Sequence, residues 1–450
     1  MTTSTPQAAR LTSLDAFRGL VMLLLIPNAF EGLAMQQMAQ RLPDDRLVGF
    51  LAGQLDHAQW TGCTVWDLIM PSFLFIAGVS LSYSRAARIS DAASFRLALR
   101  HAIVRALTLM LLGLFLMITV EKNIDLLWPL LLLMVGMPLG EWLAKALRRK
   151  PQGFAAAFNF AYAVVALIAS AAWLWMNRER SNWAFHDVLP QLALVYVFAF
   201  LLAGCSTRTR YFATFAILFL YWLAFALYPL PHVAPDPASI GLEPGDEVFS
   251  GFLAHWNKGT NIAAAFDRWF LDSLPRAEPF AFNGHGYTTL NFIPSIASVL
   301  IGTIVGDYLR TTRDPGALRN RLLLAAAACL LAGSLLGLTI CPVVKSIWTP
   351  AFVLFSTGWV LIIFSVFYHF YEVRHGGRWL WPLVVAGLNP IVLYVFSRYY
   401  RYWILEPWHR VLGSELFAMT WAPVLDAALV GLSLWVMALA MYRLRLFIRL

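Results

Sequence analysis

About twelve apolar stretches run along the chain, each close to the roughly 20 residues that a helix needs to cross a bilayer. Backbone polar groups in lipid must find partners within the spanning structure, and the period-2 alternation of a barrel is absent, so these stretches predict helices. We therefore expect an all-α fold, a polytopic membrane helix bundle. The predicted spans are residues 17–37, 65–86, 97–120, 124–146, 154–177, 187–206, 210–229, 288–309, 320–341, 347–372, 379–400 and 422–446.

The composition leaves few other classes open. Of 450 residues, 60% are hydrophobic and 13% are charged, whereas a soluble domain is nearer one quarter charged. Too little polar surface exists to cover such a chain in water, which excludes a soluble enzyme, a disordered chain and a disulfide scaffold. The net charge of +9 is typical of basic cytoplasmic loops in a membrane protein, so we expect the lipid bilayer and no nucleic acid as partner.

The loop charges orient the bundle. Basic clusters occupy every second gap, and the intervening gaps are neutral or acidic. Because basic loops stay in the cytoplasm, this alternation predicts that both termini are cytoplasmic and that loops 38–64, 230–287 and 401–421 face outward. The basic clusters are Arg85/Arg88/Arg96/Arg100, Lys145/Arg148/Arg149/Lys150, Arg208/Arg210, Arg310/Arg313/Arg319/Arg321, Arg374/Arg378 and Arg443/Arg445/Arg449.

Residues 1–450 read as a single transmembrane domain. The 230–287 loop is too long for a simple connector, and an amphipathic piece near 261–273 predicts an ordered extracytoplasmic cap. Residues 120–180 are interpreted as a two-helix insertion.

Polar residues at membrane depth are functional candidates because they are costly there. Asn28 and Glu31 share a face of the first predicted helix, close to Pro27, which can kink it. Asn28 either serves a catalytic role or satisfies a carbonyl freed at the kink.

The outer mouth of the second predicted span carries His57 and Asp67. Thr64-x-x-Asp67 is a capping box, which satisfies the free N–H groups of a helix start. Asp67 therefore either caps the helix or orients His57, and His57 is either catalytic or a solvated loop residue.

Later segments add further candidates. Asn291 opens the eighth predicted helix, and Lys345 lies beside Trp348 at the outer end of the tenth. Asn389 follows Gly387 at a break in the eleventh, where irregular backbone usually lines a cavity. His101 and Arg105 lie near the inner end of the third, where they could meet an anionic ligand from the cytosol. The stripe of small residues Ser295, Ser298, Gly302 and Gly306 is explained by close helix packing.

Several catalytic signatures are missing. The chain has no GxxxxGK[ST], GxSxG or HExxH, and no His/Cys/carboxylate cluster with metal spacing. Nothing indicates NTP hydrolysis, a serine hydrolase or a zinc enzyme, and we expect no metal.

Five motifs occur in order along the chain: Leu14-Asp15-Ala16-Phe17-Arg18-Gly19-Leu20, His57-x-x-Trp60-x-Gly62-x-Thr64-x-x-Asp67-Leu68-x-x-Pro71-x-Phe73-x-Phe75-x-x-Gly78, Asn291-Phe292-x-Pro294-Ser295-Ile296-Ala297, Pro342-x-x-Lys345-x-x-Trp348-Thr349 and Gly387-x-Asn389. Together they resemble the heparan-alpha-glucosaminide N-acetyltransferase family and its bacterial relatives, a group of transmembrane acyltransferases. Met70 stands where the family usually has Phe, and Gln191 stands in a turn that lacks the family's arginine.

The resemblance implies transfer of an acyl group, acetyl in the best-known member, from cytosolic acyl-CoA to an extracytoplasmic amino sugar or glycan. It maps the active-site histidine to His57 and its partner asparagine to Asn28. Acyl-CoA would be the co-substrate, with contacts expected from His101 and Arg105. Substrate contacts are expected from Trp60, Asn291, Lys345, Trp348 and Asn389.

Two other classes compete with an enzyme. A bundle of twelve helices with both chain termini in the cytoplasm, one helix being broken at Asn389, also suits a small-molecule transporter. The two halves of the sequence show no internal repeat, however. A non-catalytic sensor or assembly protein is the third class. We expect a multi-pass protein of the bacterial inner (cytoplasmic) membrane, and the sequence leaves a homodimer open.

Overall fold

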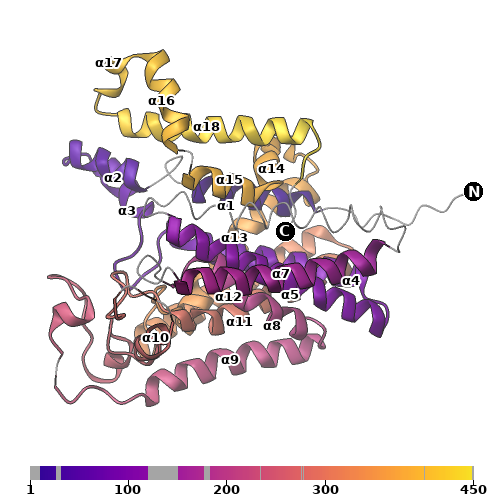
Figure 1. Cartoon of the computed structure of the whole chain (residues 1–450), viewed down its shortest axis with the longest axis horizontal. Helices are drawn as coiled ribbons and strands as arrows, with labels where there is room; N and C mark the ends of the chain where they lie inside the picture. The colour runs from indigo at the N-terminus through magenta and orange to yellow at the C-terminus, as the bar shows by residue number, and fades with distance from the viewer. Residues whose placement is uncertain are drawn as a thin grey trace, which may run out of the picture. The chain divides into compact units, whose positions relative to one another are not determined.

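The computed structural model describes residues 11–26, 32–119, 151–176, 183–233, 235–274, 276, 278–399 and 401–447. Within these ranges the chain is helical and contains no strand (Figure 1). The chain divides into two compact units: Met1–Ile76, Tyr308–Leu335 and Leu354–Arg449 form unit 1, and Ala77–Asp307 with Leu336–Val353 forms most of unit 2.

Seven helical stretches among the described residues are long and apolar enough to cross a membrane. They correspond to seven of the predicted spans and indicate a multi-pass membrane protein. The stretches are Trp66–Ala87, Ala92–Leu114, Thr207–Leu227, Thr289–Thr311, Pro315–Thr339, Pro350–Val373 and Ala422–Arg443.

The remaining predicted spans differ. Span 379–400 is a pair of helical pieces bent by 64° at the break before Pro390. Span 187–206 is the shorter helix α8 (Val188–Leu202), and span 154–177 lies in α7 (Pro151–Met176). Span 124–146 lies outside the described residues, so one half of the predicted insertion is described.

The predicted first span, residues 17–37, is divided between two helices. Helix α1 (Thr12–Leu25) ends where Ile26 adopts an extended backbone (ψ 111°). The residue before a proline is pushed out of the helical region, so Pro27 explains this end. Helix α2 (Gly32–Arg41) follows, and Asn28 and Glu31 lie outside the described residues.

In unit 1, α1 packs closely against α14 (Trp381–Gly387). A Cβ on Gly19 would lie 1.7 Å from the Leu383 carbonyl oxygen, and one on Gly387 would lie 2.1 Å from the Asp15 carbonyl oxygen. The two backbones can therefore approach only because both positions are glycine. This contact joins the first and last motifs of the resemblance.

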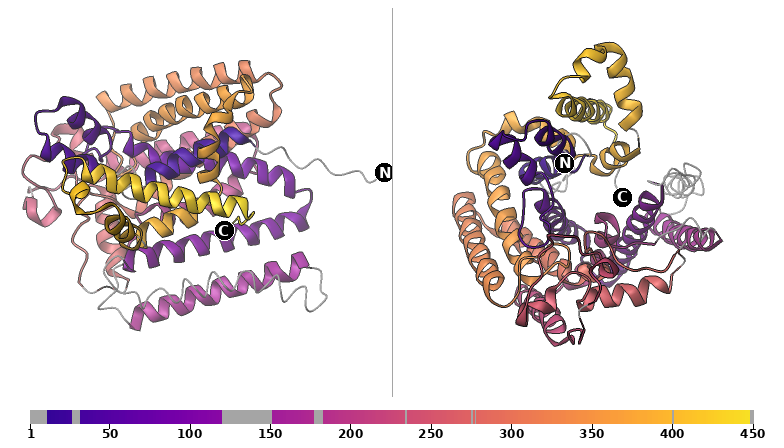
Figure 2. Two further views of the ribbon diagram at one scale, coloured as in Figure 1. Left: turned by 90° about the horizontal axis from the view of Figure 1, so that it is seen from above. Right: turned by 90° about the vertical axis from the view of Figure 1, so that its left-hand side faces the viewer.

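In unit 2, the stripe of small residues on α11 (Phe292–Thr311) faces α4 (Ile69–Arg88). A Cβ on Gly78 would lie 2.1 Å from the Val299 carbonyl oxygen, and one on Gly306 would lie 2.7 Å from Ser82 Cβ. The predicted packing role of Gly302 and Gly306 is therefore confirmed. Helix α5 (Ala92–Thr119) lies against both α7 and α8 (Figures 1 and 2).

Helix ends from the predicted basic gaps meet within unit 2. Asp307 near the end of α11 accepts a hydrogen bond from Ser82 at 2.6 Å and forms an ion pair with Arg210. Arg210 lies in the first turn of α9 (Thr207–Leu227) and also donates to Thr303. The ends of α4 and α11 and the start of α9 therefore lie together.

Helix ends also meet within unit 1. Ser13, at the start of α1, donates its hydroxyl to Glu372 at 2.9 Å. Glu372 belongs to the π-helical turn η7 (His369–Val373), which follows α13 (Pro350–Tyr368). The same turn is contacted by α12 (Pro315–Thr339): Nη1 of Arg319, near the start of that helix, lies 2.9 Å from Nδ1 of His369. The N-cap residue Leu11 makes no side-chain hydrogen bond, and the Glu372 carboxylate accepts from the Ser13 backbone N–H at 3.4 Å, one of the N–H groups at the start of α1.

Short helices occur in the described part of the 230–287 segment. It contains η4 (Pro237–Ile240), η5 (Gly251–Trp256) and α10 (Ile262–Asp272). Helix α10 confirms the amphipathic helix predicted near residues 261–273. Ala263, Asp267 and Leu271 are buried, and Trp269 is 71% exposed. The remaining elements among the described residues are α3 (Arg46–Gln54), η1 (Trp66–Leu68), η6 (Thr289–Asn291), η8 (Gly377–Leu380), α15 (Pro390–Tyr399), α16 (Arg401–Leu412), α17 (Ser414–Phe417) and α18 (Ala422–Arg443).

Candidate active site

His57 and Asp67 form a hydrogen-bonded pair in unit 1. Nδ1 of His57 lies 2.8 Å from Oδ1 of Asp67. The Asp67 side chain is fully buried, whereas 37% of the His57 side chain is exposed. A buried carboxylate thus holds one nitrogen of a ring that solvent and substrates can reach.

The second oxygen of Asp67 builds the predicted capping box. Oδ2 accepts from the backbone N–H groups of Thr64 and Ala58 at 3.1 and 3.2 Å. The hydroxyl oxygen of Thr64 lies 3.3 Å from the Asp67 backbone nitrogen and accepts from it. The two interpretations of Asp67 therefore both hold, since one oxygen orients His57 and the other begins the helix η1–α4.

These contacts determine what His57 can do. A carboxylate facing Nδ1 favours the tautomer with a proton on Nδ1, which leaves the lone pair on Nε2. The Trp66 ring packs edge-on beside the imidazole at 6.4 Å, and the Thr64 hydroxyl donates to the Asp56 carbonyl at 2.6 Å, which fixes the loop that carries His57. The arrangement can accept a proton at Nε2 or attack a carbonyl with it.

Trp60, from the same motif, is only 4% exposed. Its expected contact with substrate stays a prediction. Asn28, the predicted partner of His57, lies outside the described residues.

Asn291 lies in unit 2 and forms hydrogen bonds through both ends of its side-chain amide. Its Nδ2 donates to the Ser346 carbonyl at 2.9 Å, and its Oδ1 accepts from the Thr288 hydroxyl at 2.8 Å. It is 2% exposed. Asn291 therefore ties η6 to the loop before α13, which positions the segment containing Lys345 and Trp348.

The Pro342–Thr349 motif is a compact turn. The Thr349 hydroxyl donates to the Pro342 carbonyl at 2.7 Å and accepts from the Val344 N–H at 3.1 Å. Trp348 adopts a left-handed backbone (φ 49°), is 1% exposed, and its buried Nε1 has no hydrogen-bond partner among the described residues. Backbone strain of this kind often occurs at functional sites.

Lys345 is also largely buried, with 9% of its surface exposed. Its Nζ lies 5.5 Å from the centre of the Tyr287 ring, within the range of a cation–π contact. The turn thus directs the lysine toward the 230–287 segment.

Asn389 occupies the break between α14 and α15 in unit 1. It is fully buried, and its Nδ2 donates to the Leu446 carbonyl at 3.0 Å. Leu446 follows the end of α18, so the break between α14 and α15 lies next to the C-terminal end of α18. Asn389 therefore holds the C-terminal end of α18 against the broken helix.

The predicted cofactor residues His101 and Arg105 both lie on α5. His101 is exposed, whereas Arg105 is half-buried, stacks over the Tyr196 ring at 4.8 Å and donates to its hydroxyl at 3.3 Å. Nε of Arg105 is buried without a hydrogen-bond partner among the described residues.

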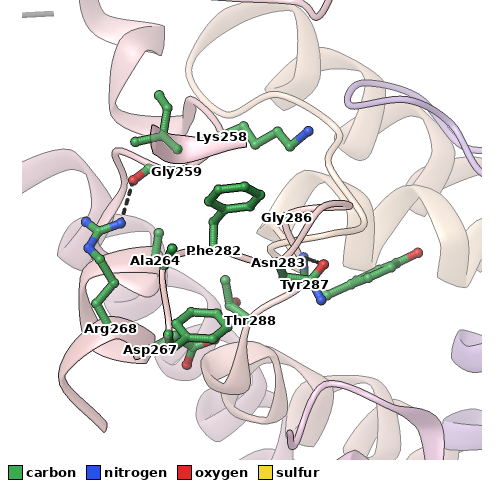
Figure 3. Close-up of a pocket in the computed structure, with 13 residues that line it drawn as sticks. Lys258, Gly259, Ala264, Asp267, Arg268, Phe282, Asn283, Gly286, Tyr287 and Thr288 are labelled. Carbon is green, nitrogen blue, oxygen red and sulfur yellow. Dashed lines mark hydrogen bonds between the residues drawn. The ribbon is translucent and has the colours of Figure 1, made fainter. Parts of the chain in front are cut away.

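Sequence reasoning missed a pocket in the cap of unit 2, between α10 and residues 280–288 (Figure 3). Asp267 forms part of its wall and accepts from the Thr289 N–H with both oxygens, at 2.9 and 3.1 Å. Burial raises the pKa of Asp267 to about 6. The amphipathic pattern placed Asp267 on a helix but could not show its partner, 22 residues away.

Gln191 was also missed as a structural residue. It is fully buried, and its Nε2 donates to the carbonyls of Phe185 and Thr289 at 2.7 and 3.1 Å. It therefore links the start of α8 to η6, where the cap enters α11.

No protein-family model matches this chain, and no curated protein matches it.

Proposed function

We propose that the chain is an integral-membrane acyltransferase that moves an acyl group, acetyl being the first choice, from cytosolic acyl-CoA to an extracytoplasmic amino sugar or glycan. The observation that carries the proposal is the His57–Asp67 pair, with Nδ1 and Oδ1 2.8 Å apart, the carboxylate buried and the imidazole partly exposed. A histidine whose tautomer is fixed by a carboxylate is suited to proton transfer and to nucleophilic attack.

Two routes use the same atoms. In the direct route, Nε2 of His57 takes a proton from the acceptor amine or hydroxyl while that atom bonds to the thioester carbonyl carbon. The carbon–sulfur bond breaks, and the departing thiolate receives the proton from the imidazolium. Asp67 stabilises the imidazolium during the transfer.

In the covalent route, Nε2 attacks the thioester carbonyl, the carbon–sulfur bond breaks, and CoA leaves as the thiolate, while Asp67 stabilises the acyl-imidazolium through its Nδ1 proton. The acceptor amine or hydroxyl then bonds to the acyl carbon as the bond from that carbon to Nε2 breaks, and the freed Nε2 takes up the proton of the acceptor. Donor and acceptor could thus react at different times from opposite sides of the membrane. Asn28 is proposed to stabilise the developing oxyanion with its amide N–H.

We further propose twelve spans with both termini in the cytoplasm of a bacterial inner membrane. The meeting of helix ends from basic gaps supports this topology: Ser82, Arg210 and Asp307 in unit 2, and Arg319 with His369 in unit 1. Such clusters are expected where loops retained by the positive-inside rule converge.

A single-turnover experiment tests the reaction. The purified chain in proteoliposomes is mixed with acyl-labelled acetyl-CoA and a glucosamine acceptor, with His232→Ala, an exposed cap histidine, as matched control. We expect His57→Ala to lower transfer by about 10²–10⁴-fold and His232→Ala to leave it unchanged. Full turnover in His57→Ala would refute the proposal.

The same mixture without acceptor separates the two routes. Label retained on the protein and absent from His57→Ala supports the covalent route. Release of free CoA only when acceptor is added supports the direct route.

A transporter remains the second candidate because α14 and α15 are bent by 64° around the fully buried Asn389. Broken helices often bind transported substrates. Accumulation of label inside vesicles without acyl transfer would support the transporter. A sensor or assembly protein would show neither activity.

A further inference from the structure

Helix α3 carries two apolar rows, and only one of them packs into unit 1. Val48 and Ala52, four residues apart, are buried. Leu47, Phe50 and Leu51 form the second row and are 66%, 63% and 39% exposed. Because positions i, i+3 and i+4 share one face of a helix, these three side chains present a continuous apolar surface that points away from unit 1.

The third side of α3 is open. Nothing lies within 4 Å of a Cβ added at Gly49 or at Gly53, and Arg46 at the start of the helix is exposed. The helix therefore has protein on one side, an apolar row on the second, and small or charged residues on the third. A helix that lies in the surface of a bilayer has such sides, because its apolar row enters the boundary between headgroups and acyl chains while another side faces water.

The start of α3 lies beside the start of a membrane span. Arg41, at the end of α2, donates to the carbonyls of Met419 and Thr420 at 2.8 and 3.2 Å. Trp421, the next residue, is the N-cap of α18, which is long and apolar enough to cross a membrane. Helix α2 packs against both α18 and α3. The α2–α3 pair is therefore held where α18 enters the bilayer.

The end of α3 lies beside the start of a second span. The carbonyl of Asp56, two residues beyond α3, accepts from the Thr64 hydroxyl at 2.6 Å. Thr64 in turn caps η1–α4, which forms the span Trp66–Ala87. Helix α3 is thus tied at both ends to places where spans begin.

Basic residues indicate that these two spans begin on the same side of the membrane. Arg85 and Arg88 lie at the end of α4, and Arg443 and Arg445 lie at the end of α18. Basic ends remain on one side of a membrane, so the starts of both helices lie together on the other side. This places α3 at the level of one membrane–water interface, whereas the loop charges predict only that residues 38–64 face outward.

Lipid fits the exposed row better than a second copy of this chain. Each partner in a stable protein complex contributes about 800 Å² of surface. Three partly exposed side chains cover less than this, since even a large aromatic side chain covers only about 150–250 Å². A bilayer surrounds the starts of both spans and covers the row without a further partner.

We propose that α3 lies in the membrane–water interface, with Leu47, Phe50 and Leu51 inserted among the lipids of the leaflet in which η1–α4 and α18 begin. This position of α3 does not depend on acyl transfer.

Cysteine accessibility in the full chain, reconstituted in nanodiscs, tests the proposal. We expect Leu47→Cys and Phe50→Cys to react with a water-soluble maleimide at least about tenfold more slowly than Gly49→Cys and Gly53→Cys, because the reactive thiolate is disfavoured among lipids. The two glycine variants are the matched controls on the same helix. All four positions are exposed, so each variant is expected to fold. Equal rates at the four positions would overturn the proposal.

Mass spectrometry that locates the modified residue separates each rate from those of the four native free cysteines. The number of chains in each nanodisc then separates lipid from a second copy. Discs that hold one chain should preserve the slow reaction of Leu47→Cys and Phe50→Cys. Slow reaction confined to discs that hold two chains would assign the row to a second copy and refute lipid as its partner.

Discussion

Asp67 contacts His57 with one carboxylate oxygen and uses the other to begin a helix. The catalytic candidate and the start of η1–α4 therefore share one buried side chain. A change at Asp67 can be designed to alter the imidazole while leaving the capping contacts in place.

Asp67→Asn is that change. The two backbone N–H groups at Oδ2 require an acceptor, so the amide oxygen faces Thr64 and Ala58, and the amide NH₂ faces His57. Nδ1 must then accept a hydrogen bond, which places the proton on Nε2 and removes the lone pair. We expect acyl transfer to fall by about 10²–10⁴-fold with little change in melting temperature. Transfer that stays at its original rate would show that Asp67 does not orient a catalytic His57.

Substitutions of Thr64 test how much the hydroxyl of this residue stabilises the loop that carries His57. Its hydroxyl donates to the Asp56 carbonyl and accepts from the Asp67 N–H. Thr64→Val keeps the shape but removes both contacts, so we expect a loss of about 1–2 kcal/mol in stability and slower transfer. Thr64→Ser retains the hydroxyl and serves as control. Thermal unfolding of both variants in detergent measures the difference.

Asp267 predicts a dependence of stability on pH. Burial raises its pKa from 3.8 to about 6, so between these values the folded chain holds a proton that the unfolded chain has lost. Stability from this group is therefore fully present below about pH 4 and is lost as pH rises through 6, by up to about 3 kcal/mol. Asp267→Asn should remove this component from melting curves recorded between pH 4.5 and 7. A variant with the same slope as the unchanged chain would show that Asp267 does not titrate in this range.

The sequence predicted the helical class, seven of the apolar spans and α10 because hydrophobic periodicity is local. It also predicted the capping box, since Thr64 and Asp67 are three residues apart. It could not decide whether Asp67 also reaches His57, because that contact depends on how the loop of residues 57–63 folds back.

Local sequence patterns could not predict hydrogen bonds between residues far apart in the chain. Asn291 is expected to contact substrate, and the structure shows that its amide donates to the Ser346 carbonyl, 55 residues away. Asn389 was placed at a break that could line a cavity, and its amide meets Leu446. In both cases the hydrogen-bond partner depends on tertiary packing, which the local sequence does not show.

Glycine substitutions in unit 1 test the packing of the first motif against the last. In Gly19→Ala the new methyl group would lie 1.7 Å from the Leu383 carbonyl oxygen, and backbone atoms cannot move aside cheaply. We expect a loss of more than about 3 kcal/mol, seen as little folded protein after extraction. Gly387→Ala should behave alike because its Cβ would meet the Asp15 carbonyl.

Gly49→Ala is the matched control within the same unit, because nothing lies within 4 Å of the added Cβ. Gly49 lies in the interior of α3, where alanine is favoured over glycine by about 0.5–1 kcal/mol. The control should therefore melt at the same temperature or slightly higher. If Gly19→Ala melts as the control does, α1 and α14 do not pack as closely as their backbones indicate, and the first and last motifs would then have no shared structural role.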